Sequence, residues 1–196
     1  VGAAHGKVIA ALHTPFLKMG QLAMKQTKQQ LYDRAAKIGQ FISKSDHEQM
    51  RGVAKTAGLA YEDVLYLNVF YSLTTRKIAC RQVVLWGSMA EGGRLLHARN
   101  LDWNDYPGSP LQTFHTIANV APPKGQAYVH LTWPGILGVL TGTNQAGLTI
   151  AFNQLPSGEK VRTAEPTAFT LKRVLRNCKT IDEAVKLIPV SYTHLR

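Results

Sequence analysis

The spacing of apolar residues divides the chain into a helical first part and a strand-rich second part. Over residues 1–79 apolar side chains recur every three or four positions, as Ile9, Leu12 and Phe16 show. This is the period of an amphipathic helix. We therefore expect residues 1–79 to form a helical N-terminal segment.

Two of these expected helices have recognisable ends. Ser45 or Asp46 is expected to cap one helix, because short polar side chains accept hydrogen bonds from the first free N–H groups. That helix is expected to end near Gly58, and the next to run over residues 60–72.

From residue 80 onward the pattern is typical of strands. Residues 83–86 are a continuous apolar run, as in a strand covered on both faces. After a turn at residues 91–93, an antiparallel return strand is expected at residues 94–99. Four more strands are expected, at residues 113–118, 126–133, 136–141 and 148–152.

The helical period returns near the end of the chain. Helices are expected over residues 167–177 and 180–187, the second with Thr180 as its N-cap. The order of helices, antiparallel strands and helices indicates an α+β fold rather than an alternating α/β fold. We expect the core to span residues 80–188 and residues 189–196 to be a non-native tail on a truncated chain.

Charge adds little to this picture. The chain has 23 Lys and Arg against 12 Asp and Glu, a net charge of +11. The basic residues are dispersed, and the group Lys172, Arg173, Arg176 and Lys179 is expected to be a solvated helix face. A basic nucleic-acid binder is thus an alternative that the pattern does not favour. Apolar runs are also shorter than the roughly 20 residues that span a membrane.

The two cysteines differ in their surroundings. They have neither the number of a disulfide framework nor the spacing of a zinc site. Cys178 lies in a helical pattern and is expected to be a small buried residue. Cys80 opens a strand, and the return strand carries Arg99 and Asp102 opposite it. A thiol, a guanidinium and a carboxylate brought together by a hairpin predict a site for covalent catalysis.

The spacing within the return strand sets a condition on that site. Residues three positions apart point to opposite faces of an unbroken strand. We therefore expect the strand to break near Asn100, so that Arg99 and Asp102 can both approach Cys80.

Other conspicuous side chains fit structural roles. His97 alternates with apolar neighbours and is expected to be a hydrogen-bonded structural histidine. Trp86, Trp103 and Trp133 are expected in the core or in a pocket wall. No pattern indicates a metal site.

Two motifs together resemble the peptidase C45 family. The first is Cys80 followed, after two strands, by Arg-Asn-Leu-Asp-Trp at residues 99–103. The second is Gly-x-Leu-x-Gly-x-Asn-x-x-Gly-Leu-x-x-x-x-Asn at residues 138–153. These are isopenicillin-N acyltransferase-like enzymes, related to cholylglycine hydrolases, penicillin V acylases and acid ceramidase-like amidases. The resemblance covers residues 2–188.

The resemblance implies an N-terminal-nucleophile (Ntn) hydrolase, an αββα sandwich of antiparallel sheets. It implies self-cleavage between Ala79 and Cys80, which leaves two subunits and gives Cys80 a free α-amine as base for its own thiol. Arg99 would favour the thiolate, Asp102 would orient the amine, and Asn153 would stabilise the oxyanion. The substrate would be a small acyl-amide or peptide, or an acyl-CoA, with no metal or organic cofactor.

Two features of the residues leave alternatives open. Ala79 and Arg81 stand where the family commonly has Gly and Thr or Ser, so a non-catalytic relative that binds an acyl or peptide ligand is the second hypothesis. Cys80 also fits an ordinary strand cysteine, Arg99 with Asp102 a structural ion pair, and Asn153 a turn residue.

Overall fold

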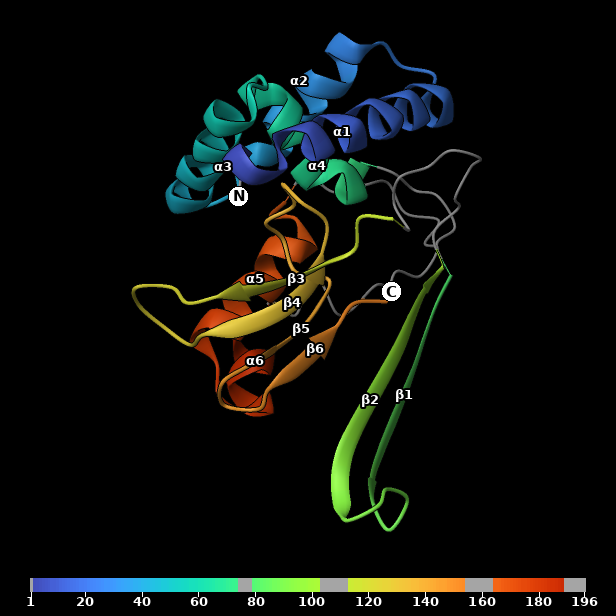
Figure 1. Cartoon of the computed structure of the whole chain (residues 1–196), viewed down its shortest axis with the longest axis vertical. Helices are drawn as coiled ribbons and strands as arrows, with labels where there is room; N and C mark the ends of the chain where they lie inside the picture. Colours follow the sequence, from blue (N-terminus) through green and yellow to red (C-terminus); the bar gives the residue numbers. More distant parts are fainter. Residues whose placement is uncertain (1, 74–78, 103–112, 154–163, 189–196) are drawn as a thin grey trace.

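The computed structural model describes residues 2–73, 79–102, 113–153 and 164–188. The described residues form a helical bundle, a four-stranded sheet with two helices, and a two-stranded hairpin. Figure 1 shows the two helices behind the sheet and the long hairpin extending beside it. The predicted α+β class is confirmed. Residues 189–196, expected to be a tail, lie outside the described residues.

Four helices form the bundle, within residues 2–73. They are α1 (Gly2–Met24), α2 (Lys28–Gly39), α3 (Lys44–Ala57) and α4 (Tyr61–Leu73). Helix α4 is the central one, and Val64, Leu67 and Val69 on different sides of it are fully buried. A helix covered on all sides can be apolar all round, so α4 lacks a polar face.

The ends of α3 correct one expectation. Its N-cap is Ser43, whose side chain accepts a hydrogen bond from the Asp46 N–H at 3.2 Å. The expected cap at Ser45 or Asp46 is wrong, because both residues already lie in the first helical turn. The expected end is confirmed at Gly58, which adopts a left-handed conformation with φ of 69°.

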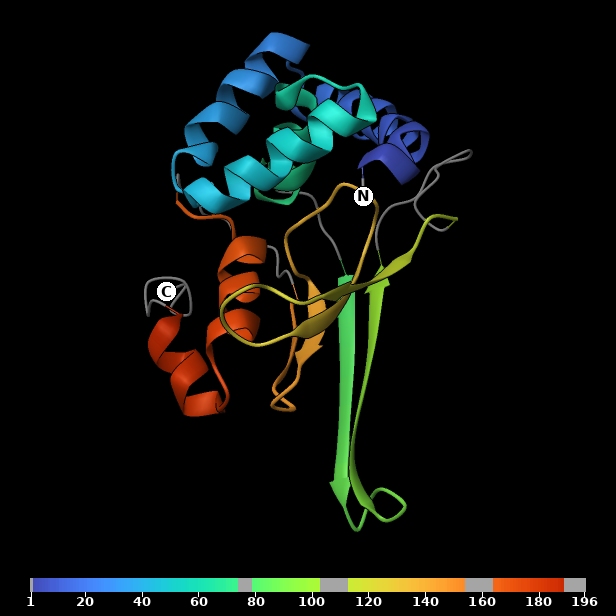
Figure 2. The same cartoon turned by 60° about the vertical axis from the view of Figure 1, so that its left-hand side comes forward.

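Strands β1 (Ala79–Gly87) and β2 (Gly93–Asp102) form the antiparallel hairpin. Figure 2 shows that its far end projects away from the helices. The expectation that this strand is covered on both faces is wrong, because Val83 is 56% and Trp86 58% exposed. Trp86 therefore belongs to neither core nor pocket wall, because no second layer covers its end of the hairpin in the described part of the chain.

The sheet contains β3 (Thr116–Val120), β4 (Tyr128–Thr132), β5 (Thr141–Asn144) and β6 (Thr149–Ala151), antiparallel and in sequence order. The strand expected at residues 136–141 is wrong, since β5 begins only at Thr141. The preceding residues form a loop held by Asn68 of α4, which donates to the Gly135 carbonyl at 2.8 Å and accepts from the Leu137 N–H at 2.7 Å. The loop packs on the bundle through buried Ile136.

Helices α5 (Thr167–Asn177) and α6 (Ile181–Leu187) confirm the predicted C-terminal pair. Thr180 is the N-cap of α6, as predicted, and accepts from the Glu183 N–H at 3.2 Å. Cys178 is buried, also as predicted. The sheet packs on these helices through Tyr128 and Leu175. None of the described helices is long and apolar enough to cross a membrane.

Lys172 corrects the expectation of a solvated basic face. Its side chain is buried between α5 and the bundle, with the residue only 7% exposed. It forms an ion pair with Asp46 of α3 and donates to Gln49 at 3.1 Å. Arg173, the next residue, is half-exposed and pairs with Glu165 at 3.1 Å. The Lys172–Asp46 ion pair therefore joins α5 to the helical bundle, at a place where little water screens the two charges.

We expect Lys172→Met to lower the free energy of unfolding by about 3 kcal/mol, because it leaves the Asp46 carboxylate nearly buried without its partner. Arg173→Met is the matched control and should cost less than about 1 kcal/mol, since its ion pair is solvated. Urea denaturation of both variants measures the difference. Equal losses would show that the Lys172 pair contributes nothing beyond a surface pair.

Candidate active site

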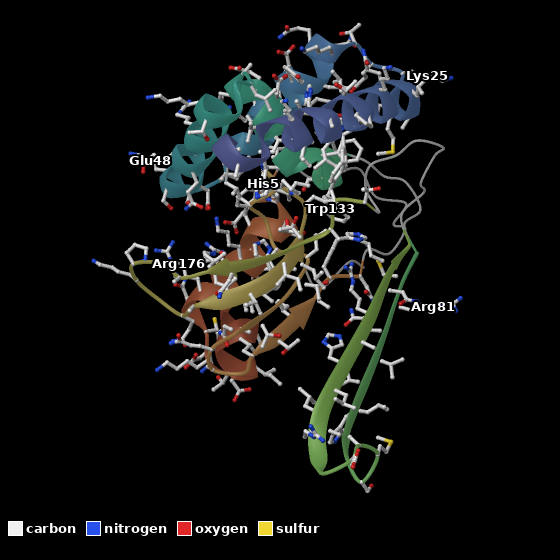
Figure 3. All side chains as sticks on the ribbon, viewed as in Figure 1. His5, Lys25, Glu48, Arg81, Trp133 and Arg176 are labelled. Atoms are coloured by element: carbon white, nitrogen blue, oxygen red, sulfur yellow. The ribbon has the colours of Figure 1, made fainter. Side chains whose placement is uncertain are left out.

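The hairpin register places the candidate residues on one face. The directly opposed pairs are Cys80 with Leu101, Gln82 with Arg99, and Val84 with His97. Opposed residues of an antiparallel pair project to the same side. The intervening Arg81 points outward, away from the sheet, in Figure 3. The face that carries Cys80 and Arg99 therefore looks toward the sheet.

Arg99 connects the hairpin to the sheet. Its Nη1 donates to Thr141 Oγ1 at 3.0 Å, and its Nη2 donates to the Phe152 carbonyl at 2.6 Å. The same Nη2 lies 3.6 Å from Cys80 Sγ. The two anchors on β5 and after β6 hold the guanidinium against the thiol, which is half-buried.

The expected break near Asn100 is wrong. Strand β2 continues through Asn100 and Leu101, and the backbone of Asp102 pairs with Ala79. The hairpin already brings Arg99 to Cys80 without a bend, because the two residues lie on the same face. The side chain of Asp102 and the whole of Trp103 lie outside the described residues.

Asn153 directly follows the carbonyl that anchors Arg99. Its Oδ1 is buried and has no hydrogen-bond partner among the described residues, and the same holds for Nε of Arg99. Buried polar atoms are nearly always paired. Each of these two unpaired groups is available to a hydrogen-bonding ligand.

A cavity of about 610 Å³ adjoins this face, within the range of small-molecule sites. Its walls come from His97, Arg99 and Leu101 of β2 and from the outer face of the sheet. The sheet side combines apolar residues (Ile117, Val129, Leu131, Leu140 and Trp133) with polar ones (His115, His130, Thr132, Thr141, Thr143 and Thr149). Cys80 and Asn153 are not among its wall residues, so Arg99 is the link between cavity and thiol.

Trp133 and His97 match their expectations. Trp133 is 5% exposed and lines the cavity where the sheet meets the bundle (Figure 3). His97 is hydrogen-bonded, with its Nε2 2.8 Å from Gln82 Oε1. Among the described residues, no group of three His, Cys, Asp or Glu side chains is placed to hold a metal ion.

Three residues around the site were not predicted. Besides Thr141 and Phe152, Tyr71 of α4 lies within electrostatic range of Arg99 and Cys80. Burial raises the pKa of Tyr71 well above its usual value, the charge of Arg99 opposes this, and Cys80 adds to it. The helical segment therefore contributes a side chain that interacts electrostatically with Arg99 and Cys80. No sequence signal marked Tyr71, because the helix around it is apolar on all sides.

His130 of β4 gives the fold a measurable pH dependence. Burial, assisted by the charge of Lys172, lowers the pKa of His130 to about 4. Between pH 6.5 and 4 the unfolded chain binds a proton at this residue and the folded chain does not. The free energy of unfolding should therefore fall as the pH falls through this window, by on the order of 3 kcal/mol in total.

His130→Gln should reduce this slope and leave only the part due to His13, whose pKa is also lowered by burial. His5→Gln, at an exposed histidine of α1, should leave the slope unchanged. Urea denaturation at pH 6.5, 5 and 4 measures both. A His130→Gln variant with the full pH slope would show that other groups cause it.

The chain also matches known proteins. The model of the acyl-coenzyme A:6-aminopenicillanic acid acyl-transferase family matches residues 88–190. The class defined by this match is the Ntn hydrolases, as the resemblance implied. The chain belongs to the acyl-coenzyme A:6-aminopenicillanic acid acyl-transferase family.

Individual relatives agree with this membership. Protein dcd1A of Dictyostelium discoideum is 31% identical over 156 residues, which cover 76% of this chain and 35% of the relative. An N-acylethanolamine-hydrolyzing acid amidase of Caenorhabditis elegans is 28% identical over 177 residues, covering 82% and 48%. Acid ceramidase of Mus musculus is 32% identical over 200 residues, covering 90% and 48%. The chain thus spans about a third to a half of these relatives.

Proposed function

We propose that this protein cleaves or transfers acyl groups of linear amides, with the thiol of Cys80 as nucleophile. The observation that carries the proposal is the 3.6 Å contact between Arg99 Nη2 and Cys80 Sγ, with the same guanidinium anchored on Thr141 and Phe152. If Arg99 served only as a partner in a structural ion pair, it would not need to lie against a thiol. An activated thiolate, by contrast, requires a cation fixed beside the sulfur. Membership of the acyltransferase family and similarity to an amidase support it.

Maturation is the first step of the proposal. Cys80 Sγ attacks the carbonyl carbon of Ala79, the Ala79–Cys80 peptide bond breaks, and the acyl group moves from nitrogen to sulfur. Water then hydrolyses the thioester, which releases the helical segment's C-terminal carboxylate and frees the Cys80 α-amine. We propose that the segment stays bound as a separate subunit through contacts such as the Asp46–Lys172 ion pair.

Turnover follows with the groups thus freed. The α-amine accepts the thiol proton, the thiolate attacks the acyl carbonyl, and the ammonium returns the proton to the leaving amine. Water hydrolyses the acyl-enzyme in a hydrolase, whereas an amine or thiol takes the acyl group in a transferase. In this proposal Arg99 stabilises the thiolate, Asp102 orients the α-amine, and the Asn153 amide donates to the oxyanion.

The decisive test is mass spectrometry of the protein expressed from its complete coding sequence. Two fragments, the second beginning at Cys80, are the expected result. Incubation with an acyl amide and rapid acid quenching should then add the acyl mass to the second fragment. A chain that stays uncut and gains no acyl group would contradict the proposal, and would favour the non-catalytic binder suggested by the Ala79-Cys80-Arg81 flank.

A further inference from the structure

The hydrogen-bonding state of His97 follows from its partner. Gln82 Nε2 donates to the Ala151 carbonyl at 3.3 Å, which fixes the orientation of the Gln82 amide. The Oε1 of Gln82 therefore faces His97 Nε2, at 2.8 Å, and an amide oxygen can only accept. Nε2 of His97 must then carry the hydrogen. In the neutral ring this leaves Nδ1 as a hydrogen-bond acceptor.

His97 belongs to a cavity wall that combines apolar side chains with threonines and histidines. His97 lines the cavity together with Arg99, two positions along the same face of β2. Opposite them lie Ile117, Val129 and Leu131 of the sheet. Apolar walls suit the hydrocarbon part of a ligand, and an acceptor held in one orientation discriminates between ligands with and without a donor at that point. The hydroxyls of Thr143 and Thr149 on the sheet side already bond each other at 2.9 Å.

The hairpin register also gives the position of the acceptor relative to the nucleophile. His97 is opposite Val84, four residues along β1 from Cys80. At about 3.3 Å per residue the imidazole lies roughly 13 Å along the hairpin from the thiol. When the carbonyl carbon of a ligand lies at Cys80, only a group about 13 Å further along the ligand can reach His97 Nδ1.

We propose that His97 is a specificity-determining residue that selects acyl groups carrying a hydrogen-bond donor, a hydroxyl or an N–H, and that Gln82 is its positioning residue. The proposal rests on the proposed function for the location of the scissile carbonyl. The apolar cavity takes the carbon chain of the acyl group, and the donor binds His97 Nδ1 at the far end. An unsubstituted chain leaves that acceptor unpaired.

The test uses amides of one amine whose straight acyl chains differ only by a terminal hydroxyl or a terminal methyl, over a series of chain lengths. The wild-type protein should prefer the hydroxylated member by about 3- to 10-fold in kcat/KM, as one neutral hydrogen bond provides. The preference should be greatest for chains that reach about 13 Å from the carbonyl.

Variants separate the two residues. His97→Leu should remove the preference, and His97→Gln, which offers an amide oxygen, should keep part of it. Gln82→Leu should reduce the preference because Nε2 and Nδ1 can then exchange the hydrogen. Val83→Thr, on the opposite face of the hairpin, is the matched control and should leave the ratio of the two substrates unchanged.

The outcomes distinguish this inference from the function on which it rests. Turnover of both amides without preference, or a preference that survives His97→Leu, would overturn the inference and leave the proposed function standing. If no amide is turned over, the proposed function fails. Calorimetric binding of the two free carboxylic acids then tests His97 directly, and equal affinities would overturn the inference.

Discussion

Replacing Cys80 with alanine is expected to leave the chain uncut and to lower amide turnover by at least about 10⁴-fold, the scale on which removal of a nucleophile acts. The thiol is both the group that would attack the Ala79 carbonyl and the group that would attack the substrate. Its loss removes both reactions without disturbing the fold, since the residue is a half-buried member of a two-stranded hairpin.

Cys178→Ala is the matched control, because it removes the other thiol of the chain at a buried position beside α5 and α6. This variant should be cut and active, with a modest loss of stability. Intact mass and an amide hydrolysis assay on both variants complete the experiment. Normal cleavage of the Cys80→Ala protein would contradict self-processing by this thiol and would point to a separate protease.

Arg99→Lys is expected to lower kcat/KM by roughly 10²-fold, although it preserves the charge, because lysine is a point charge and cannot form the same fork of contacts. The guanidinium reaches Cys80, Thr141 and Phe152 from one rigid plane. A lysine ammonium cannot reach all three groups at once, so at least one of them loses its partner. The positive charge is then no longer held at a fixed distance from Cys80 Sγ.

The rate of iodoacetamide alkylation at neutral pH is an independent readout of the same effect, since only the thiolate reacts. It should fall in Arg99→Lys and stay unchanged in Arg94→Lys, a substitution at an exposed arginine of the same strand. Equal alkylation rates in all three proteins would show that Arg99 is a structural anchor and does not activate the thiol.

The local course of the chain could be predicted from the sequence because it depends on neighbouring residues. The helical period, the end of α3 at Gly58 and the Thr180 cap are all set within a few positions. The hairpin between Cys80 and Arg99 was also predictable, since a turn signal separates two apolar runs. Two local predictions failed. The helix α3 is capped by Ser43, where several short polar residues compete for the N-cap position. The strand β5 starts late because the side chain of Asn68 bonds the preceding backbone in place of a neighbouring strand.

The arrangement of the candidate site depends on contacts that leave no local pattern. Thr141 lies 42 positions from Arg99 in the sequence, and Lys172 lies 126 positions from Asp46. Periodicity reports whether a side chain is covered, and it carries no information on which distant residue covers it.

The sequence by itself therefore determined the order of helices and strands and the hairpin that carries Cys80 and Arg99. Only the tertiary structure decided that Arg99 is anchored by the sheet and that Tyr71 of the helical segment lies within its electrostatic range. It also decided which nitrogen of His97 faces Gln82. The physical reason is that a side chain's hydrogen-bond geometry and electrostatic surroundings are properties of the packed whole, whereas periodicity and capping act along a single element.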